Sequence, residues 1–128
     1  MTKVASKPAG DERHAAVIAK AFIRAGEKLD ITSRVLGNVI GLSESSISRM
    51  RAGDGKLLVL GSKPRELATL FLRLYRSLDA IAGGDDSVSA QWLRNVNTAI
   101  GEAPIDAIQT VQGLIRVIDY LDARRAVM

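Results

Sequence analysis

The chain has 128 residues, 47% of them apolar and 25% charged, which suits one compact domain or two very small ones around a packed core. It contains no cysteine, which excludes a disulfide framework, a zinc finger and a cysteine nucleophile, and a single histidine (His14) argues against a histidine metal site or a serine–histidine triad. The net charge of +4 lies entirely in residues 1–62, which carry ten basic and six acidic side chains, whereas residues 63–128 carry eight of each. This asymmetry indicates a basic N-terminal module for a polyanion and a neutral C-terminal module with a different task.

Targeting signals and catalytic clusters are not evident. The first 16 residues, MTKVASKPAGDERHAA, lack the apolar stretch of a secretory signal, and no run approaches the roughly 18 apolar residues of a membrane span. We therefore expect a cytosolic protein with no membrane, metal or cofactor. An enzyme is the least favoured class, because the paired acids Asp85 and Asp86 are better explained as helix caps.

The chain begins with a segment that we expect to be a mobile arm, residues 1–10, which contains Pro8 and Gly10. Apolar residues then recur at the spacing of one helix face, which predicts a helix over residues 12–26. Gly26 is the expected stop of this helix. The predicted buried face consists of Ala15, Ile18, Ala19, Phe22 and Ile23.

Residues 33–50, SRVLGNVIGLSESSISRM, meet the residue-type demands of a helix-turn-helix. Gly37 is the small residue that allows the second helix to approach the first, and Gly41 tolerates the positive φ of the turn. Ser43 suits the N-cap of the second helix. Buried contacts are expected from Leu36, Ile40, Leu42, Ile47 and Met50. We interpret the segment as a DNA-binding motif, and the alternative is a helical hairpin that only packs.

The candidate DNA contacts follow from helix geometry, at about 100° per residue. With Ile47 directed inward, Arg49 and Ser45 point outward, and the fork of Arg49 matches the two acceptors of a guanine edge. The serines predicted to reach bases or phosphates are Ser43, Ser45, Ser46 and Ser48, and the predicted phosphate contacts are Arg34, Arg51 and Lys56. One recognition helix reads few base pairs, so we expect a dimer or higher assembly on a repeated or palindromic site.

The segment 51–62, RAGDGKLLVLGS, places three glycines around an apolar run at residues 57–60. It predicts a linker at 57–62 that separates a DNA-binding domain (11–56) from a helical domain (63–128). The apolar run is compatible with a short strand-like segment or with a plug in a groove between the modules.

Residues 63–82 have the strongest helical periodicity, with Pro64 in the first turn and a Gly83–Gly84 stop. The expected apolar positions are Leu67, Leu70, Phe71, Leu74, Tyr75, Leu78 and Ile81. Asp85, Asp86 and Ser87 are each a possible cap of a short helix that contains Val88, Trp92 and Leu93.

After a loop at 95–103, Pro104 opens a short helix over 104–109, and Thr110 caps a final helix. The predicted face of that helix consists of Val111, Leu114, Ile115, Ile118 and Leu121. Because no useful strand-like alternation occurs, the predicted fold is all-α, with an N-terminal helix-turn-helix bundle followed by a small helical domain.

Three runs of the second half, FLRLYRSLDAIAGGDD (71–86), QWLRNVNTAIGEAPIDAI (91–108) and TVQGLIRVIDYLDARRA (110–126), resemble the toxin-binding domain of Xre/MbcA/ParS-type antitoxins. The residues that carry the resemblance are Leu78, Asp79, Trp92, Leu93, Asn97, Ala99, Ile100, Gly101, Pro104, Thr110, Gly113, Val117 and Leu121. It covers residues 63–128, and with the Xre-like helix-turn-helix it spans nearly the whole chain.

The resemblance implies an antitoxin of a type II toxin–antitoxin operon. The implied partner is a RES-domain toxin that degrades NAD or uses it for ADP-ribosyl transfer, and the antitoxin blocks this toxin and represses its own promoter. The toxin contacts that the resemblance implies are Arg124, Arg125, Val127 and Met128, with Tyr120 and Leu121 behind them and with Arg73 and Arg76 as further candidates. The alternative is a stand-alone repressor of phage type whose C-terminal half only dimerises. Asn97 is expected to pin its loop, and Trp92 to belong to the core.

Overall fold

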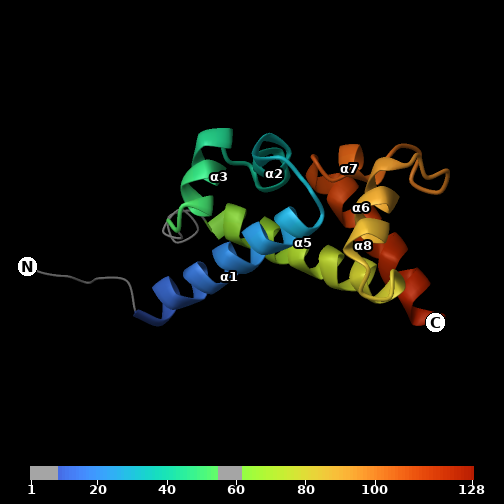
Figure 1. Cartoon of the computed structure of the whole chain (residues 1–128), viewed down its shortest axis with the longest axis horizontal. Helices are drawn as coiled ribbons and strands as arrows, with labels where there is room; N and C mark the ends of the chain where they lie inside the picture. Colours follow the sequence, from blue (N-terminus) through green and yellow to red (C-terminus); the bar gives the residue numbers. More distant parts are fainter. Residues whose placement is uncertain (1–8, 55–61) are drawn as a thin grey trace, which may run out of the picture.

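The computed structural model describes residues 9–54 and 62–128, and within these ranges every regular element is a helix (Figure 1). The helices are α1 (Ala9–Lys28), α2 (Ser33–Ile40), α3 (Glu44–Arg51), α5 (Ser62–Ile81), α6 (Asp86–Arg94), α7 (Pro104–Ala107) and α8 (Val111–Ala126). The all-α prediction is therefore confirmed. Lys56, the apolar run 57–60 and residues 1–8 of the predicted arm lie outside the described residues, and residues 9 and 10 of that arm belong to α1.

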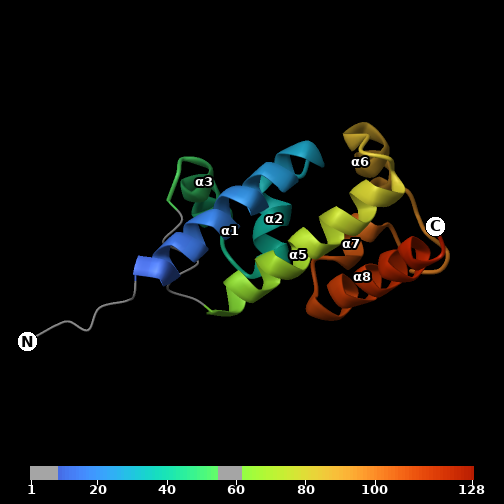
Figure 2. The ribbon, with the colours of Figure 1, turned by 90° about the horizontal axis from the view of Figure 1, so that it is seen from below.

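Helix α5 is the central element of the molecule. It packs against α1 and α2 and, further along, against α8 and α6. Figures 1 and 2 show α5 running from the helix-turn-helix helices at one end of the molecule to α6, α7 and α8 at the other. Phe22 of α1 meets Phe71 of α5 edge to face, with 5.2 Å between ring centroids, and both side chains are fully buried. Aromatic pairs favour this geometry, so this contact joins the two long helices in one core.

The predicted end of α1 at Gly26 is wrong, because α1 continues to Lys28. Asp30 adopts a left-handed conformation with φ 57°, and the amides of Asp30 and Ile31 donate to the carbonyls of Glu27 and Gly26. This pattern is the Schellman motif, with an aspartate where glycine is usual. Gly26 has a packing role instead, since a Cβ there would lie 2.6 Å from Leu36 Cδ1.

Local signals in the second half place most helix boundaries as expected. Gly83 and Gly84 both have positive φ after α5, and Asp85 caps α6 by accepting hydrogen bonds from the amides of Ser87 and Val88. Hydrogen bonds from the Ser87 hydroxyl and these amides lower the pKa of Asp85 below its usual value. Helix α7 ends at Ala107, two residues before the predicted end.

The predicted face of α8 is partly wrong. Leu114, Ile118 and Leu121 are buried as expected, but Val111 is 55% exposed and Ile115 is 39% exposed. Val117 is fully buried instead. The apolar stripe is therefore rotated toward Val117, because α5 covers that side of α8.

Candidate functional site

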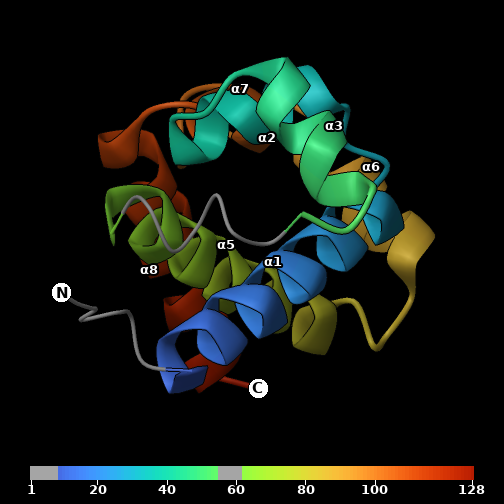
Figure 3. The same cartoon turned by 90° about the vertical axis from the view of Figure 1, so that its left-hand side faces the viewer.

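The turn between α2 and α3 has the geometry that the sequence predicts for a helix-turn-helix. A Cβ on Gly37 would lie 2.4 Å from the carbonyl oxygen of Leu42, so only glycine fits at this position. Gly41 ends α2 with φ 78°, and the Ser43 hydroxyl accepts a hydrogen bond from the Ser46 amide at the start of α3. Ile47 and Met50 are buried beneath α3. Figure 3 shows α2 and α3 together on one side of α1 and α5.

The outer face of α3 exposes polar side chains. Ser45, Ser48 and Arg49 are exposed, and so are Ser43 at the N-cap and Arg34 on α2. Arg49 Nη2 donates a hydrogen bond of 3.3 Å to Ser46 Oγ, so the guanidinium lies along the helix near its N-terminal end. Helix α3 therefore offers an arginine and several hydroxyls on one accessible face.

Two predicted DNA contacts have roles inside the protein. Ser46 is only 8% exposed, and its hydroxyl accepts hydrogen bonds from Ser43 and Arg49, so the expected exposure of Ser46 is wrong. Arg51 is half-buried, and its guanidinium donates to Ser33 Oγ (2.8 Å), Glu27 Oε2 (3.2 Å) and the Ile31 carbonyl (3.2 Å). It thereby ties the end of α3 to the corner between α1 and α2. The helical period places Arg51 on the inward side of α3 but does not reveal these partners.

The predicted toxin contacts lie at the end of the molecule where α5 and α8 run side by side. Asp122 Oδ1 accepts a hydrogen bond of 2.8 Å from the buried hydroxyl of Ser77, and Asp122 also pairs with Arg73. Arg125 Nη1 donates to the same Ser77 hydroxyl (3.3 Å). Burial alone would raise the pKa of Asp122, but the hydrogen bonds from Ser77 and Arg73 lower it below its usual value. Arg73 and Arg125 therefore share one network that fastens α8 to α5.

An aromatic pair lies beside this network. Tyr120 stacks on Trp92 with 6.1 Å between ring centroids, and Arg124 Nη1 donates to the Tyr120 hydroxyl (2.9 Å). Hydrogen bonding with Asn97 and the proximity of Arg124 lower the pKa of Tyr120, against the effect of burial. Leu121, by contrast, is 1% exposed, so it lies behind the exposed side chains of α8 and not on the surface.

The end of α8 exposes the remaining predicted contacts. Val127 is 82% exposed and Met128 is 74% exposed, and the exposed Arg124 and Arg125 precede them. Arg76 is not part of this group, since it lines a groove between α5 and α1. The structure therefore gathers five of the eight predicted contacts (Tyr120, Arg124, Arg125, Val127 and Met128) on the last two turns of α8 and its end, with Arg73 joined to them through Asp122.

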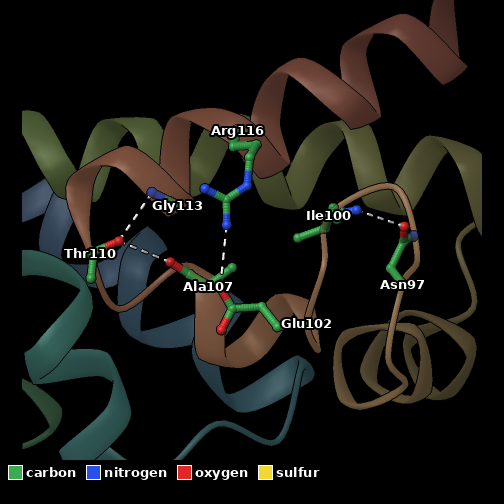
Figure 4. A network of polar contacts seen from close by, with 7 residues as sticks. All are labelled: Asn97, Ile100, Glu102, Ala107, Thr110, Gly113 and Arg116. Carbon is green, nitrogen blue, oxygen red and sulfur yellow. Dashed lines mark hydrogen bonds and ion pairs between the residues drawn. The ribbon is translucent and has the colours of Figure 1, made fainter.

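The segment between α6 and α8, which contains α7, is held by polar contacts, several of which Figure 4 shows. The Asn97 side chain accepts hydrogen bonds from the amides of Ala99 and Ile100, which confirms that it pins the loop. Thr110 caps α8 by accepting from the Gly113 amide (3.1 Å), and Arg116 pairs with Glu102 (3.2 Å). Gly113 allows α8 to begin directly against Ala107.

Two polar contacts that no sequence motif predicts join the N-terminal and C-terminal halves of the chain. Arg94, at the end of α6, donates to the carbonyls of Leu29 and Asp30 after α1. Asn38 of α2 donates to the side chain of Gln109 (2.8 Å). Both contacts span more than 60 residues of sequence, so only the tertiary structure reveals them.

Comparison with known families agrees with this geometry. Residues 9–59 match the Antitoxin Xre-like helix-turn-helix domain, and residues 77–126 match the Antitoxin Xre/MbcA/ParS C-terminal toxin-binding domain. The chain belongs to the Xre/MbcA/ParS antitoxins. No curated protein matches the antitoxin's sequence.

The helices of the antitoxin carry neither a membrane span nor a metal cluster within the described ranges. Across residues 9–54 and 62–128, no helix is long and apolar enough to cross a bilayer. The same residues contain no group of three or more histidine or acidic side chains that could hold a metal ion.

Proposed function

We propose that the antitoxin neutralises a RES-domain toxin by direct binding and blocks the NAD site of that toxin with the C-terminal end of α8. The observation that carries this proposal is the exposed end of α8, where the matched toxin-binding domain ends at residue 126 and the exposed Val127 and Met128 follow directly. Val127 and Met128 offer apolar area, while Arg124 and Arg125 offer charge that suits an acidic rim or the position of an NAD phosphate. Tyr120 holds Arg124 from behind through its hydroxyl.

The test is co-expression with the RES-domain protein of the same operon, followed by growth rescue and copurification. Deletion of residues 126–128 and substitution Arg124→Ala are each expected to weaken rescue. Arg116→Ala is the matched control, because Arg116 is also exposed on α8 but pairs with Glu102, and an exposed pair contributes little to stability. Full rescue by the truncated antitoxin would refute the assignment of the α8 end.

We further propose that the antitoxin represses its own operon through α3. Arg49 would read a base edge, Ser43, Ser45 and Ser48 would contact bases or phosphates, and Arg34 would bind a phosphate. Arg49→Ala is expected to weaken operator binding by about 1–3 kcal/mol and to relax base preference at one position. Arg13→Ala, on α1, is the control for the loss of one exposed arginine. Wild-type operator affinity of Arg49→Ala at physiological salt would show that α3 is oriented differently.

The proposal also covers domain division, assembly and compartment. It assigns residues 11–56 to DNA and residues 63–128 to the toxin, in the cytoplasm, with a dimer or a larger complex on the operator. Phosphate roles for Arg51 and Lys56 stay predictions, and the bonds of Arg51 to Ser33 and Glu27 would have to open for such a role. Operator binding without any copurifying toxin would instead favour a stand-alone repressor.

A further inference from the structure

A groove of about 450 Å³ lies between α1 and α5, which pack against each other in Figure 2. Its floor is apolar and aromatic and consists of Val17, Ala21, Ala25, Leu72 and Tyr75. Val17 is 64% exposed, so its side chain is accessible to a partner. Ala25 (3% exposed) and Leu72 (9% exposed) are buried, so Val17, Ala21 and Tyr75 supply the apolar area that the described residues leave accessible.

The rim of the groove is basic. It consists of Lys20, Arg24, Lys28 and Arg76, all exposed, and the groove lining includes no carboxylate. None of the ion pairs among the described residues involves these four cations. Among the described residues, Asp86 accepts a hydrogen bond from the Tyr75 hydroxyl (3.3 Å), and burial together with the charges of Asp86 and Asp79 raises the pKa of Tyr75. The charge of the rim is thus left for an external partner.

The basic residues of the rim on α1 are spaced so that one side of a partner helix can lie along them. Lys20, Arg24 and Lys28 recur every four residues and form one stripe beside Val17 and Ala21. From Val17 to Lys28 the stripe is about 16 Å long, which equals about three helical turns. An occupant that fills it needs an apolar ridge flanked by negative charge over the same length.

We propose that this α1–α5 groove is a docking site for an acidic amphipathic helix of a partner protein. The apolar ridge of that helix covers Val17, Ala21 and Tyr75, and its carboxylates meet the basic rim. Nucleic acid fits less well, because a phosphate backbone gains nothing from an apolar floor. A lipid surface also fits less well, because the main apolar face of α1, with Ala15, Ala19 and Phe22, is already buried in the core.

The groove shares no residue with the predicted DNA contacts, and it shares only Arg76 with the predicted toxin contacts. Its occupant can therefore bind while α3 and the end of α8 are engaged. The inference rests on the surface of α1 and α5, so it stands or falls independently of the proposed function.

The test is a selection from a display library of peptides of about 16 residues, long enough for four helical turns, on the immobilised full-length protein. The enriched peptides are expected to combine acidic residues with apolar residues at i, i+3 and i+4. The affinity of the best one, measured by fluorescence anisotropy, should fall about tenfold, or about 1.4 kcal/mol, in Arg24→Glu. Arg13→Glu is the matched control, because it makes the same charge change at an exposed site on α1 outside the groove, and it should stay within about twofold.

Two variants that leave the charge of the protein unchanged distinguish docking in the groove from general electrostatic attraction of an acidic peptide. Ala21→Leu fills the floor without changing charge and should also weaken the peptide about tenfold, whereas Ala16→Leu, at an exposed position outside this groove, should not. Circular dichroism checks that each variant is folded. Enriched peptides without acidic residues, or equal affinity for wild type, Arg24→Glu and Ala21→Leu, would overturn the proposal. So would a selection that enriches no peptide while Arg24→Glu weakens binding to duplex DNA or to phosphatidylglycerol vesicles.

Discussion

Replacing Gly113 with alanine is expected to destabilise the protein, although the same change in an open helix stabilises it. Alanine favours the helix over glycine by about 1 kcal/mol. In this structure, however, the added Cβ would lie 1.8 Å from the carbonyl oxygen of Ala107 and 2.6 Å from its carbon. Both are backbone atoms, so no side chain can rotate out of the way. The α7–α8 corner must open by more than 1 Å to reach even 3.0 Å, below which Cβ contacts are essentially never seen, and ordinary van der Waals contact begins at 3.4 Å.

The magnitude follows from three contributions. Overpacking of a buried site costs about 1–3 kcal/mol. Opening the corner also weakens the Thr110 cap on the Gly113 amide, which contributes about 1 kcal/mol. After subtraction of the gain in helix propensity, the free energy of unfolding should fall by about 2 kcal/mol. For a chain of this length, that lowers Tm by about 8 °C.

Thermal unfolding followed by circular dichroism at the helical band measures this change. Gly10→Ala is the matched control, since Gly10 lies in α1 and a Cβ there meets no heavy atom within 4 Å. The control should leave Tm unchanged or raise it slightly. A Gly113→Ala protein as stable as the control would refute the close approach of α8 to Ala107.

Two further predictions concern the helix-turn-helix and the α5–α8 network. Gly37→Ala places a Cβ 2.4 Å from the Leu42 carbonyl oxygen, so α3 must move. We expect the free energy of unfolding, measured by thermal unfolding, to fall by about 1–3 kcal/mol. Operator binding in gel-shift titrations should weaken as well. The pKa of Asp122 is lower in the folded protein than in the unfolded chain, so its ionised form stabilises the fold above about pH 4, where the unfolded carboxyl is already charged. This stability is lost as the pH falls through the pKa of Asp122 in the folded protein. Asp122→Asn should therefore flatten the acid limb of a urea-unfolding series, and an unchanged slope between pH 5 and pH 2 would contradict the bonds from Ser77 and Arg73.

The helices and their caps could be predicted from the sequence because they depend on neighbours a few residues apart. Thr110 and Asp85 cap helices through amides two or three residues later, and Gly41 ends α2 through its own φ. The small residue Gly37 was identifiable because the helix-turn-helix fixes the spacing between its two helices. The exposed Arg49 followed from the helical period alone.

The availability of individual side chains at the candidate sites could not be predicted in the same way. Ser46 and Leu121 both carry the right residue type on the right helix, yet both are buried, and the Ser46 hydroxyl is bonded to Ser43 and Arg49. The guanidinium of Arg51 bonds to partners that are 18 to 24 residues away in the sequence, so its contacts in this structure stabilise the fold. Residue type and spacing predict which face of a helix is buried, but with an uncertainty of about one residue at each border of that face. Which residues at the border are buried depends on where the neighbouring helix packs.

The sequence by itself determined the all-α fold, the helix-turn-helix and the family, because periodicity, glycines and caps are local and ordered along the chain. Tertiary structure decided the role of Gly26, which Leu36 packs against while α1 continues to Lys28. It also decided that Val117 rather than Val111 is buried, and that Lys20, Arg24 and Arg76 meet around one groove. These outcomes depend on the angles at which α5 crosses α1 and α8, and crossing angles are set by the packing of whole side-chain rows rather than by any short segment.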